Sequence, residues 1–508
     1  MSATIPAGVL DVRNPADGRL IATVAVDDRE TVSLVAADLR DAQVGWAEAG
    51  PRQRAKWLHR WRDWILDHTD ELTNLLQAET GKVRPDALVE TTASCEFISY
   101  YADHAAKFLA GEQVRSSSLL TLSKRLTTTY HPFPVVGMIM PWNFPITLFL
   151  MDAAPALAAG CAVLAKSSEE TPLTCARIIE GWHEIGAPAV LAHVVGDGDS
   201  GAAVVDAADF VQFTGSTATG RAVAIRCAEH LKPMSLELGG KDPAIVLEDA
   251  DLARAVEGIA WGALFNAGQV CISVERVYVV SEVYDEFVAR LTQRVRSLAH
   301  GAAGRDVGAM VTARQVDIAD RHVSEAVVAG ARVLAGGTRS AVGNYYAPTV
   351  LVGVDHTMAC MTEETFGPTI PVMQVADENE AIRLANDSAY GLSATVWTRD
   401  HARAQRIALQ LNAGAVNIND VFSNLFATTL PHSGWKASGI GARLGGAHGL
   451  RKYCRVQAVT EPRIPVLSRE LTWYPYTPRR AAMAGRVLRA AAGRGLWQRL
   501  GLNKENSK

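Results

Sequence analysis

Apolar residues recur three and four positions apart over residues 27–117, which is the spacing of helices that bury one face. Trp57, Trp61 and Trp64 follow this spacing. These tryptophans could form a platform for stacking a ligand, but at helical spacing they are expected to lie in the core. The region is therefore predicted to be mostly helical. A run of β-branched residues, Thr127–His131, then predicts an extended strand.

From Pro134 onward, short apolar runs alternate with segments of helix length. The first series of predicted strands is Val135–Met140, Ala162–Ala165, His193–Val195, Phe210–Phe213 and Ser235–Leu238. The second series is Ala244–Val246, Val277–Val280, Val333–Ala335, Ile370–Val372, Ala394–Val396 and Ala415–Ile418. Strands that alternate with helices are typical of βαβ units and parallel sheets. The expected fold class is α/β, with two doubly wound lobes and a boundary near Gly239 and Gly240.

The composition narrows the class of protein. A chain of 508 residues is too long for one small core, so two or three domains are expected. The net charge of -4 argues against nucleic acid as a partner. The first twenty residues lack the basic start and apolar core of a secretory signal, and no run approaches the ~18 apolar residues of a membrane-spanning helix. We expect a cytoplasmic protein.

Seven cysteines are scattered along the chain without a CxxC pair. This pattern predicts neither a disulfide framework nor a zinc site, so no metal is expected. Cys271 follows a helix-like run at 251–266 and precedes an alternating apolar run at 275–280, which predicts that it lies on a connecting loop. Loops on a rigid scaffold often carry reactive groups, although most cysteines are simply small buried hydrophobes.

The last segment of the chain, 462–508, differs from the rest in composition. Its final part, 479–508, holds eight basic residues and one acidic residue. Met483, Val487 and Ala491 would share one face of a helix there, and a basic amphipathic helix can bind an anionic membrane surface. Three glycines interrupt the pattern, and each weakens a helix by about 1 kcal/mol relative to alanine. Weak peripheral membrane contact, packing on a neighbouring subunit and disorder all stay open.

A strand, a glycine-bearing turn and a helix are predicted in succession over residues 210–220. Gly215 and Gly220 allow a ligand to approach the backbone closely, and the following helix offers its N–H groups and positive end to a pyrophosphate. The glycine spacing resembles an ATP-binding P-loop, but Arg221 and Ala222 stand where that motif needs Lys and Ser or Thr. A nucleoside triphosphatase is therefore disfavoured. Taken alone, such a glycine-bearing turn more often only connects two secondary-structure elements and binds no ligand.

Three charged residues lie at the ends of predicted parallel strands. Lys166 and Glu169 follow strand 162–165 and suit ribose hydroxyls, although a surface ion pair is the plainer alternative. Glu237 lies between two leucines at the end of strand 235–238. Removal of water from a carboxylate raises its pKa toward the range of a general base. A structural glutamate bound to backbone amides is equally consistent with the sequence.

The loop after strand 135–140 reads Pro141-Trp-Asn-Phe-Pro145. Its two prolines restrict the backbone. The side-chain amide of Asn143 can donate a hydrogen bond to a developing oxyanion. An asparagine in a turn can also be there for the geometry of the turn alone.

These signals occur together, in order, in one α/β chain: a loop asparagine, a lysine–glutamate pair, a phosphate-cradling turn, an apolar glutamate and a loop cysteine. In this combination the sequence resembles the NAD(P)-dependent aldehyde dehydrogenase family, from about Asn14 to Ala458. The motifs that carry the resemblance are PWNFP (141–145), KSSEETPL (166–173), FTGST (213–217), LELGGK (236–241), GQVC (268–271), EETFGP (363–368) and SGWKASGIG (433–441).

The resemblance implies a role for each matched position. Cys271 is the expected nucleophile, Glu237 the general base, and Asn143 an oxyanion donor together with the backbone N–H of Cys271. The expected cofactor contacts are Trp142, Lys166, Glu169, Gly215, Ser216, Glu364 and Phe366. In this chemistry a thiolate adds to the aldehyde, hydride passes to the nicotinamide, and water activated by the base hydrolyses the thioester.

Several positions bear on cofactor and substrate. Glu169 would repel the extra phosphate of NADP, so NAD is the expected cofactor. Ser167 replaces the proline common in the family and loosens the turn, and His432 replaces a phenylalanine that many members have at the substrate entrance.

The resemblance also implies a substrate tunnel. On the family's geometry Phe144, Leu148 and Met151 would line this tunnel and make it apolar, although these residues could equally be core. His432 would line the entrance and leaves its shape and polarity open. Semialdehyde enzymes of the family often have an arginine near Met151. Its absence disfavours succinate semialdehyde as the substrate, although an arginine from another loop could take its place.

Two other functions stay open. A CoA-acylating semialdehyde dehydrogenase would pass the thioester to CoA, and Glu237 argues against it because that reaction needs no hydrolytic base. An inactive structural protein on this fold is disfavoured because catalytic groups in matched roles favour an enzyme.

The resemblance finally implies a domain plan. Residues 1–113 and 133–239 would bind NAD, and 240–430 would form the catalytic domain. Residues 114–132 and 450–461 would supply oligomerisation strands to a sheet shared between subunits, which implies a homodimer or homotetramer. Residues 462–508 would be a basic extension.

Overall fold

The computed structural model describes residues 8–302, 304–463, 473–493 and 498–499. The chain divides into two compact units. The larger unit runs to Phe108 and resumes from Pro132 to Tyr453, and the smaller unit takes Leu109–His131 and the chain from Cys454 onward. None of the described helices is long and apolar enough to cross a membrane.

The first sheet of the larger unit has six strands in the order β20-β9-β8-β5-β6-β7. Its strands are β5 (Val135–Ile139), β6 (Ala162–Lys166), β7 (Leu191–Val194), β8 (Phe210–Thr214), β9 (Met234–Glu237) and β20 (Gly439–Ile440). All pair in parallel except β20, which returns from late in the chain and lies antiparallel to β9. The parallel series confirms the first predicted alternation. Strand β7 begins at Leu191, two residues before the prediction, because Leu191 is already buried.

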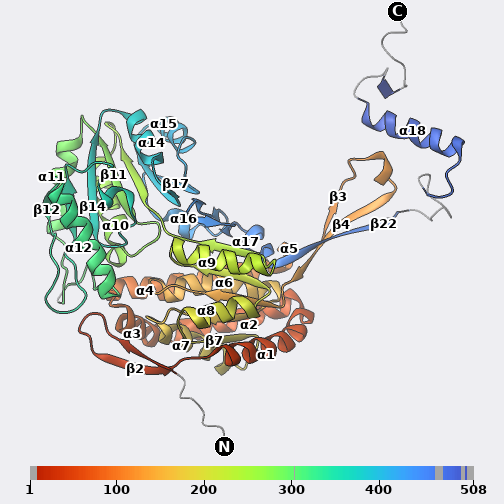
Figure 1. Cartoon of the computed structure of the whole chain (residues 1–508), viewed down its shortest axis with the longest axis horizontal. Coiled ribbons are helices and arrows are strands. Elements are labelled where there is room, and N and C mark those ends of the chain that lie inside the picture. The colour runs from red at the N-terminus through yellow and green to blue at the C-terminus, as the bar shows by residue number, and fades with distance from the viewer. Residues whose placement is uncertain (1–7, 303, 464–472, 494–497, 500–508) are drawn as a thin grey trace, which may run out of the picture. The chain divides into compact units, whose positions relative to one another are not determined.

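Helices flank this sheet and follow its strands in sequence (Figure 1). They are α6 (Pro145–Ala159), α7 (Pro172–Glu184), α8 (Gly198–Ala207) and α9 (Thr217–Glu229). Every residue of α6 is buried, including the charged Asp152. A charge at a fully buried position needs partners, so Asp152 is expected to bind positively charged or hydrogen-bonding groups.

The amino-terminal part of the larger unit begins with a hairpin and continues as five helices. The hairpin joins β1 (Val9–Arg13) to β2 (Leu20–Ala25). The helices are α1 (Arg29–Glu48), α2 (Gly50–Asp67), α3 (Thr69–Thr80), α4 (Arg84–Ala93) and α5 (Cys95–Phe108). Trp61 and Trp64 lie in the core as predicted, whereas Trp57 is half-buried. The helical prediction to 117 was too long, because a short strand replaces helix after Gly111.

The second sheet has seven strands in the order β12-β13-β14-β11-β10-β16-β17. Its strands are β10 (Asp242–Val246), β11 (Val274–Val280), β12 (Arg332–Ala335), β13 (Thr349–Val352), β14 (Thr369–Val375), β16 (Ser393–Trp397) and β17 (Ala415–Ile418). Strand β13 was not predicted, and β12 pairs antiparallel with it instead of extending the parallel series. The change of sheet falls between β9 and β10, at Gly239 and Gly240.

The helices beside the second sheet are α10 (Leu252–Leu264), α11 (Tyr284–Arg296), α12 (Ala313–Val328), α14 (Glu378–Asn386) and α15 (His401–Ala408). Short elements complete the unit: η2 (Phe265–Gly268), α13 (Ala359–Thr362), β15 (Tyr390–Gly391), α16 (Ser423–Phe426), β18 (Pro431–His432), β19 (Trp435–Lys436), β21 (Arg443–Leu444) and α17 (Ala447–Arg451). Through β20 the chain after 430 returns to the edge of the first sheet, while β18 and β21 pair with each other.

The smaller unit contains a three-stranded sheet in the order β22-β4-β3. Its strands are β3 (Glu112–Val114), β4 (Lys124–Pro132) and β22 (Cys454–Pro462), with η1 (Leu119–Thr121) between the first two. The strand predicted from 450 begins only at 454, because α17 occupies the residues before it and Leu450 and Tyr453 are buried. The predicted tail helix is present as α18 (Pro478–Ala492), which buries none of its residues. The predicted tail residues at 464–472, 494–497 and 500–508 lie outside the described part.

Candidate active site

Cys271 lies on the loop between α10 and β11, as predicted. The helix ends two residues earlier than expected, at Leu264, because Asn266, Ala267 and Gly268 all adopt left-handed φ angles of +52°, +54° and +73°. Gly268 is required there, since a Cβ atom would lie 2.2 Å from the carbonyl oxygen of Gly367. The tight turn presents the cysteine at its end.

The thiol of Cys271 is the predicted nucleophile. The residue as a whole is partly exposed, whereas the other six cysteines are buried. Loss of water around the thiol raises its pKa to about 12; the nearby Arg443 acts against this rise, and Asp242 and Glu237 add to it. The thiol is therefore protonated near neutral pH, and it needs a neighbouring group that can take its proton.

Glu237, the predicted general base, ends strand β9 and is 3% exposed. Neither of its carboxylate oxygens has a hydrogen-bond partner among the described residues. Burial raises its pKa to about 7; Arg443 and Lys452 oppose the rise, and Asp152 adds to it. A carboxyl group with this pKa can both take and release a proton near neutral pH.

Asn143, the predicted oxyanion donor, connects two loops. Its Nδ2 donates to the carbonyl oxygen of Gln269 at 2.9 Å. Asn266 Nδ2 donates in turn to the carbonyl oxygen of Asn143 at 3.1 Å and to that of Gln269 at 3.2 Å. Since an amide nitrogen carries two N–H groups, Asn143 keeps one that this bond does not use. The network fixes the PWNFP loop to the loop that carries the cysteine.

Gly239 and Gly240 bring Cys271 and Glu364 to the end of β9. A Cβ atom on Gly240 would lie 2.2 Å from the carbonyl oxygen of Cys271, and one on Gly239 would lie 2.4 Å from Glu364 Oε2. The backbone N–H of Gly240 donates to Glu364 Oε1 at 3.0 Å. Burial, with Glu275 nearby, raises the pKa of Glu364 to about 8. The glycine pair therefore lets these groups approach Glu237, two residues upstream.

A buried ion pair holds the loop that carries Glu364 and Phe366. Lys241 Nζ lies 2.6 Å from Glu275 Oε2. The two oxygens of Glu275 also accept the backbone N–H groups of Thr365 and Phe366, each at 2.8 Å. Phe366 has a left-handed φ of +51° and meets Trp142 edge to face, with ring centres 5.4 Å apart.

Sequence reasoning missed both Lys241 and Glu275. The available signal was that Glu275 is a carboxylate at the start of an apolar strand, the same kind of signal that pointed to Glu237.

The remaining predicted cofactor residues lie at the carboxyl ends of β6 and β8. Lys166 is 5% exposed, and its Nζ lies 3.4 Å from Glu169 Oε2. Ser216 caps α9 by accepting the backbone N–H of Thr219 at 3.2 Å. Gly215 precedes it, where a Cβ atom would meet the ring of Phe213. These residues fit a dinucleotide, because they provide a lysine and a carboxylate for ribose hydroxyls and a helix N-terminus for phosphate.

The residues predicted to line the substrate tunnel lie on or beside α6. Phe144, Leu148 and Met151 are 9%, 5% and 0% exposed. The ring of Phe144 stacks on that of Phe265, with centres 5.8 Å apart, and Lys82 Nζ lies 3.7 Å from the centre of the Phe144 ring. Phe265 therefore packs against the PWNFP loop.

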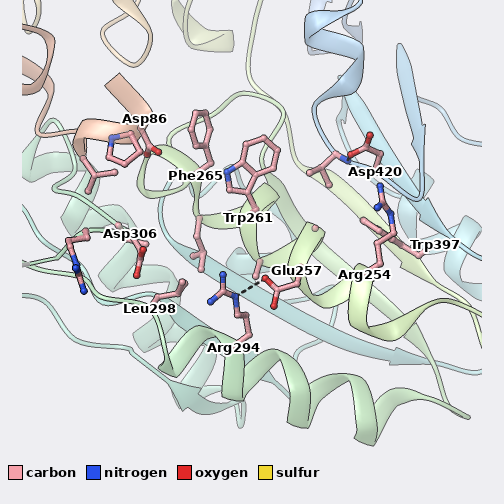
Figure 2. A pocket seen from close by; sticks show the side chains of 18 residues that line it. Asp86, Arg254, Glu257, Trp261, Phe265, Arg294, Leu298, Asp306, Trp397 and Asp420 are labelled. Atoms are coloured by element: carbon pink, nitrogen blue, oxygen red, sulfur yellow. Dashed lines mark hydrogen bonds and ion pairs between the residues drawn. The ribbon is translucent and has the colours of Figure 1, made fainter. Parts of the chain in front are cut away.

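A cavity of about 520 Å³ lies beside Phe265 and α10. Figure 2 shows Trp261 and Phe265 along its wall, with the ion pair between Glu257 and Arg294 below them. Trp397 and Leu298 add apolar surface, and Arg254, Asp306 and Asp420 add charge. Its walls thus combine aromatic rings with charged groups of both signs, and they include neither Cys271 nor Glu237.

Residues 4–459 match the aldehyde dehydrogenase family. The chain belongs to this family. It is 41% identical over 455 residues, 88% of this chain and 87% of the other, to the "Putative succinate-semialdehyde dehydrogenase (NADP(+))" of Mycolicibacterium smegmatis. It is 40% identical over 471 residues, 91% of this chain and 88% of the other, to the "4,4'-diapolycopene aldehyde oxidase" of a Methylomonas species.

Solved structures agree. The structure of the "Putative Aldehyde Dehydrogenase PutA" from Anabaena variabilis superposes with a TM-score of 0.88 at 36% identity, and covers 92% of this chain and 100% of the other. The protein is therefore an oxidoreductase with the α/β architecture of aldehyde dehydrogenases, as the sequence predicts.

This aldehyde dehydrogenase has a buried polar cluster that sequence reasoning did not find. Asp152 accepts from Arg443 Nη2 at 2.6 Å, from Tyr453 Oη at 3.0 Å and from Lys452 Nζ at 3.4 Å. Arg443 also donates to the hydroxyl of Thr214. The signal was an aspartate within the apolar run 146–159, but nothing in the sequence names its partners.

His432, the remaining predicted substrate residue of this aldehyde dehydrogenase, lies beside the predicted base. It is 2% exposed, and its Nε2 lies 3.9 Å from Glu237 Oε2. Strand β18 places it opposite Arg443 of β21. A residue expected at the substrate entrance thus faces the carboxyl group expected to activate water.

Proposed function

We propose that this aldehyde dehydrogenase oxidises an uncharged, apolar aldehyde to its carboxylic acid, with NAD as cofactor and a thioester on Cys271 as intermediate. The observation that carries the proposal is the buried carboxyl group of Glu237. It has no hydrogen-bond partner among the described residues and a pKa near 7. A buried polar group without a partner is costly, and a binding site for water or substrate gives it a purpose.

In the proposed first half-reaction, the thiol of Cys271 releases its proton to solvent, and its sulfur forms a bond to the aldehyde carbon as the carbonyl π electron pair moves onto the oxygen. The oxyanion that forms accepts N–H groups from Asn143 and from the backbone of Cys271; each such donor is typically worth a few kcal/mol. Trp142, Phe366 and Glu364 are the residues that would hold the nicotinamide end of NAD, which would supply the hydride acceptor when bound. Loss of hydride from carbon leaves a thioester on the cysteine.

In the proposed second half-reaction, Glu237 takes a proton from water as the oxygen adds to the thioester carbonyl. The carbon–sulfur bond then breaks and its electron pair returns to the sulfur of Cys271. The acid leaves, and Glu237 releases its proton. A pKa of about 7 suits a group that must do both in each cycle.

The experiment that tests this chemistry is Cys271→Ala in the full chain. We expect NADH formation from aldehyde to fall to the background of the assay, because no other described cysteine shares the exposure of this thiol. Cys175→Ala is the matched control, since that thiol is buried and lies in α7, outside the site. Undiminished turnover by Cys271→Ala would remove the thiol from the mechanism.

The preference for NAD rests on Glu169. Its carboxylate lies 3.4 Å from Lys166 at the expected ribose position, where the additional phosphate of NADP would meet a negative charge. The Mycolicibacterium relative carries NADP(+) in its name, so the point needs a direct measurement. We expect kcat/KM to favour NAD over NADP, and Glu169→Ser to reduce that ratio at least tenfold. A native preference for NADP would overturn the assignment.

The substrate class rests on the absence of an available cation among the described residues near the thiol. Arg443 is the positive group with the largest effect on Cys271, and Asp152 already binds it. An aldehyde with a free carboxylate would therefore bury an unpaired charge, which is costly. The name of the Methylomonas relative refers to 4,4'-diapolycopene aldehyde and mentions no semialdehyde, which agrees with this expectation.

Succinate semialdehyde is the second candidate, because the Mycolicibacterium relative bears that name. The arginines at the cavity beside Phe265, Arg254 and Arg294, are the groups that could bind its carboxylate. A panel of aldehydes from short to long chain, with succinate semialdehyde included, separates the two. Adding CoA to the same assay tests the acylating alternative, for which hydrolysis by Glu237 would be superfluous.

A shared sheet between subunits is the proposed basis of a homodimer or homotetramer. Strand β22 is exposed along nearly its whole length in the single chain, and an exposed strand edge is a template for pairing. Sedimentation of the purified enzyme should give at least a dimer. A monomer at working concentration would contradict the proposal.

The cytoplasm is the proposed compartment, in keeping with seven free cysteines.

Helix α18 is the proposed contact with a membrane surface. Arg479, Arg486 and Arg489 recur at a spacing that places them on one side of α18, while Met483 and Leu488 are exposed. The full enzyme should sediment with vesicles that contain anionic lipid and not with neutral vesicles. Reversing the charge of the three arginines should abolish this; equal binding to neutral vesicles would refute it.

A further inference from the structure

Glu237 and His432 face each other at the end of the first sheet. Strand β20 aligns Gly439 with Glu237, and β18 aligns His432 with Arg443 of β21. The returning segment thus places His432 Nε2 3.9 Å from Glu237 Oε2, with the two side chains 2% and 4% exposed. At this distance no hydrogen bond is formed, but an approach of about 1 Å would form one, and catalytic contacts often tighten in this way when a ligand binds.

A chain of two amides decides which nitrogen of His432 carries the proton. The backbone N–H of Asn424 donates to Asn417 Oδ1 at 3.2 Å, and since an N–H can only donate, the Asn417 amide is oriented. Its Nδ2 then donates to Asn424 Oδ1 at 3.0 Å. This leaves Asn424 Nδ2 facing His432 Nδ1 at 3.3 Å, where it must be the donor. The neutral ring therefore holds its proton on Nε2, toward Glu237.

The imidazole stays neutral in this setting. Burial lowers the pKa of His432 to about 4; Arg443 lowers it further, and Asp152 acts in the opposite direction. Because Nδ1 already accepts a hydrogen bond, the ring has no free position for a second proton. His432 can donate at Nε2, but it cannot act as a proton relay.

The other cations near Glu237 are committed elsewhere. Arg443 binds Asp152 and Thr214, and Lys452 Nζ lies 2.8 Å from Gln212 Oε1. They act on Glu237 through charge alone. Among the described residues, His432 Nε2–H is the donor facing Glu237 that has no other acceptor.

We propose that His432 is a positioning residue for Glu237. The Nε2–H of His432 donates a hydrogen bond to the Glu237 carboxylate and holds that carboxylate as an anion, ready to receive a proton from water. The proposal rests on the function proposed above, in which Glu237 is the general base. During hydrolysis the water proton goes to Glu237, the water oxygen bonds to the thioester carbon, and the carbon–sulfur bond breaks. His432 keeps its own proton throughout.

The test compares His432→Phe with His432→Gln in the full-length enzyme, because Phe removes the donor and the Gln amide can replace it. The measurement is the pH dependence of thioester hydrolysis after a burst of NADH. Loss of a hydrogen bond to a charged group should raise the midpoint by about 1 to 2 pH units in His432→Phe. Hydrolysis below the midpoint should slow by about tenfold or more, the burst should persist, and His432→Gln should restore part of the shift.

Asn424→Leu provides a second variant should the Phe variant fail to fold. It frees Nδ1, so the proton divides between both nitrogens and the midpoint should rise by a smaller amount. His104→Phe, in α5, is the control and should leave the profile unchanged.

Two outcomes overturn the proposal. If the midpoint is unchanged and only KM for the aldehyde moves, His432 merely lines the entrance. If His432→Phe slows hydrolysis further in an enzyme that already carries Glu237→Gln, then His432 acts through a group other than Glu237. Neither outcome touches the proposed function, which fails instead if Glu237→Gln alone leaves hydrolysis unaltered.

Discussion

Two buried glutamates at the junction of the two sheets have opposite surroundings. Glu275, at the start of β11, binds Lys241 and accepts the N–H groups of Thr365 and Phe366. Glu237, at the end of β9, has no hydrogen-bond partner among the described residues. Both are carboxylates in apolar strands, and the sequence gives no sign of the difference. A satisfied buried charge fixes a loop, whereas an unsatisfied one is available for chemistry.

The largest effect that separates the two glutamates is expected in turnover. Glu237→Gln removes the proposed base while conserving shape, so steady-state turnover should fall by about 10² to 10⁴ with a burst of NADH that approaches one per site. Stopped-flow absorbance of NADH measures both. Glu257→Gln, at the cavity beside α10, is the control. Loss of the burst together with the steady state would mean that Glu237 acts before hydride transfer.

A smaller effect, on stability, is expected from the other glutamate. Lys241→Met leaves Glu275 buried without its cation, which should lower the free energy of unfolding by about 3 to 5 kcal/mol. Denaturant unfolding measures it. The exposed pair Arg290–Glu286 is the control, because breaking a surface pair should cost less than about 1 kcal/mol. Equal losses from the two pairs would remove the distinction between buried and exposed charge.

The smallest expected effect is a pH-dependent gain in stability from Glu237→Gln. The pKa of Glu237 is raised from 4.5 to about 7 in the folded protein, so folding holds its proton and the native state loses stability as pH rises through this range. The loss of folding stability caused by ionising buried Glu237 is absent below pH 4.5 and complete above pH 7. Glutamine should therefore stabilise the enzyme at pH 8, on the order of 3 kcal/mol, and not at pH 4.5. Thermal unfolding at both pH values decides; equal shifts would mean that ionisation is not the cause.

The order of the fold could be predicted from local pattern, but its late segments could not. The strands of the first sheet are continuous apolar runs between helices, which is how parallel strands read in a sequence. The short strand β20 contains only Gly439 and Ile440, and it exists because the chain returns to pair with β9. Strand β13 was overlooked because β12 and β13 form an antiparallel edge that breaks the strand–helix alternation.

The site could be predicted as far as its motifs reach. Cys271 and Asn143 stand in recognisable loops, and the structure joins those loops through Gln269 and Asn266. The partners that set the electrostatics could not be found, because Arg443 lies 291 residues beyond Asp152 in the chain. Tertiary pairing of this kind leaves only one trace in a sequence, which is a charge in an apolar run.

The exposure of a single cysteine has a consequence for the durability of the protein. With six thiols out of reach and the seventh protonated at rest, peroxides and alkylating agents find almost no thiolate to attack. Sulfur becomes vulnerable only when its proton leaves during a catalytic cycle. Oxidation and alkylation of Cys271 should therefore increase with the number of catalytic cycles, and both should be slow in enzyme that has no substrate.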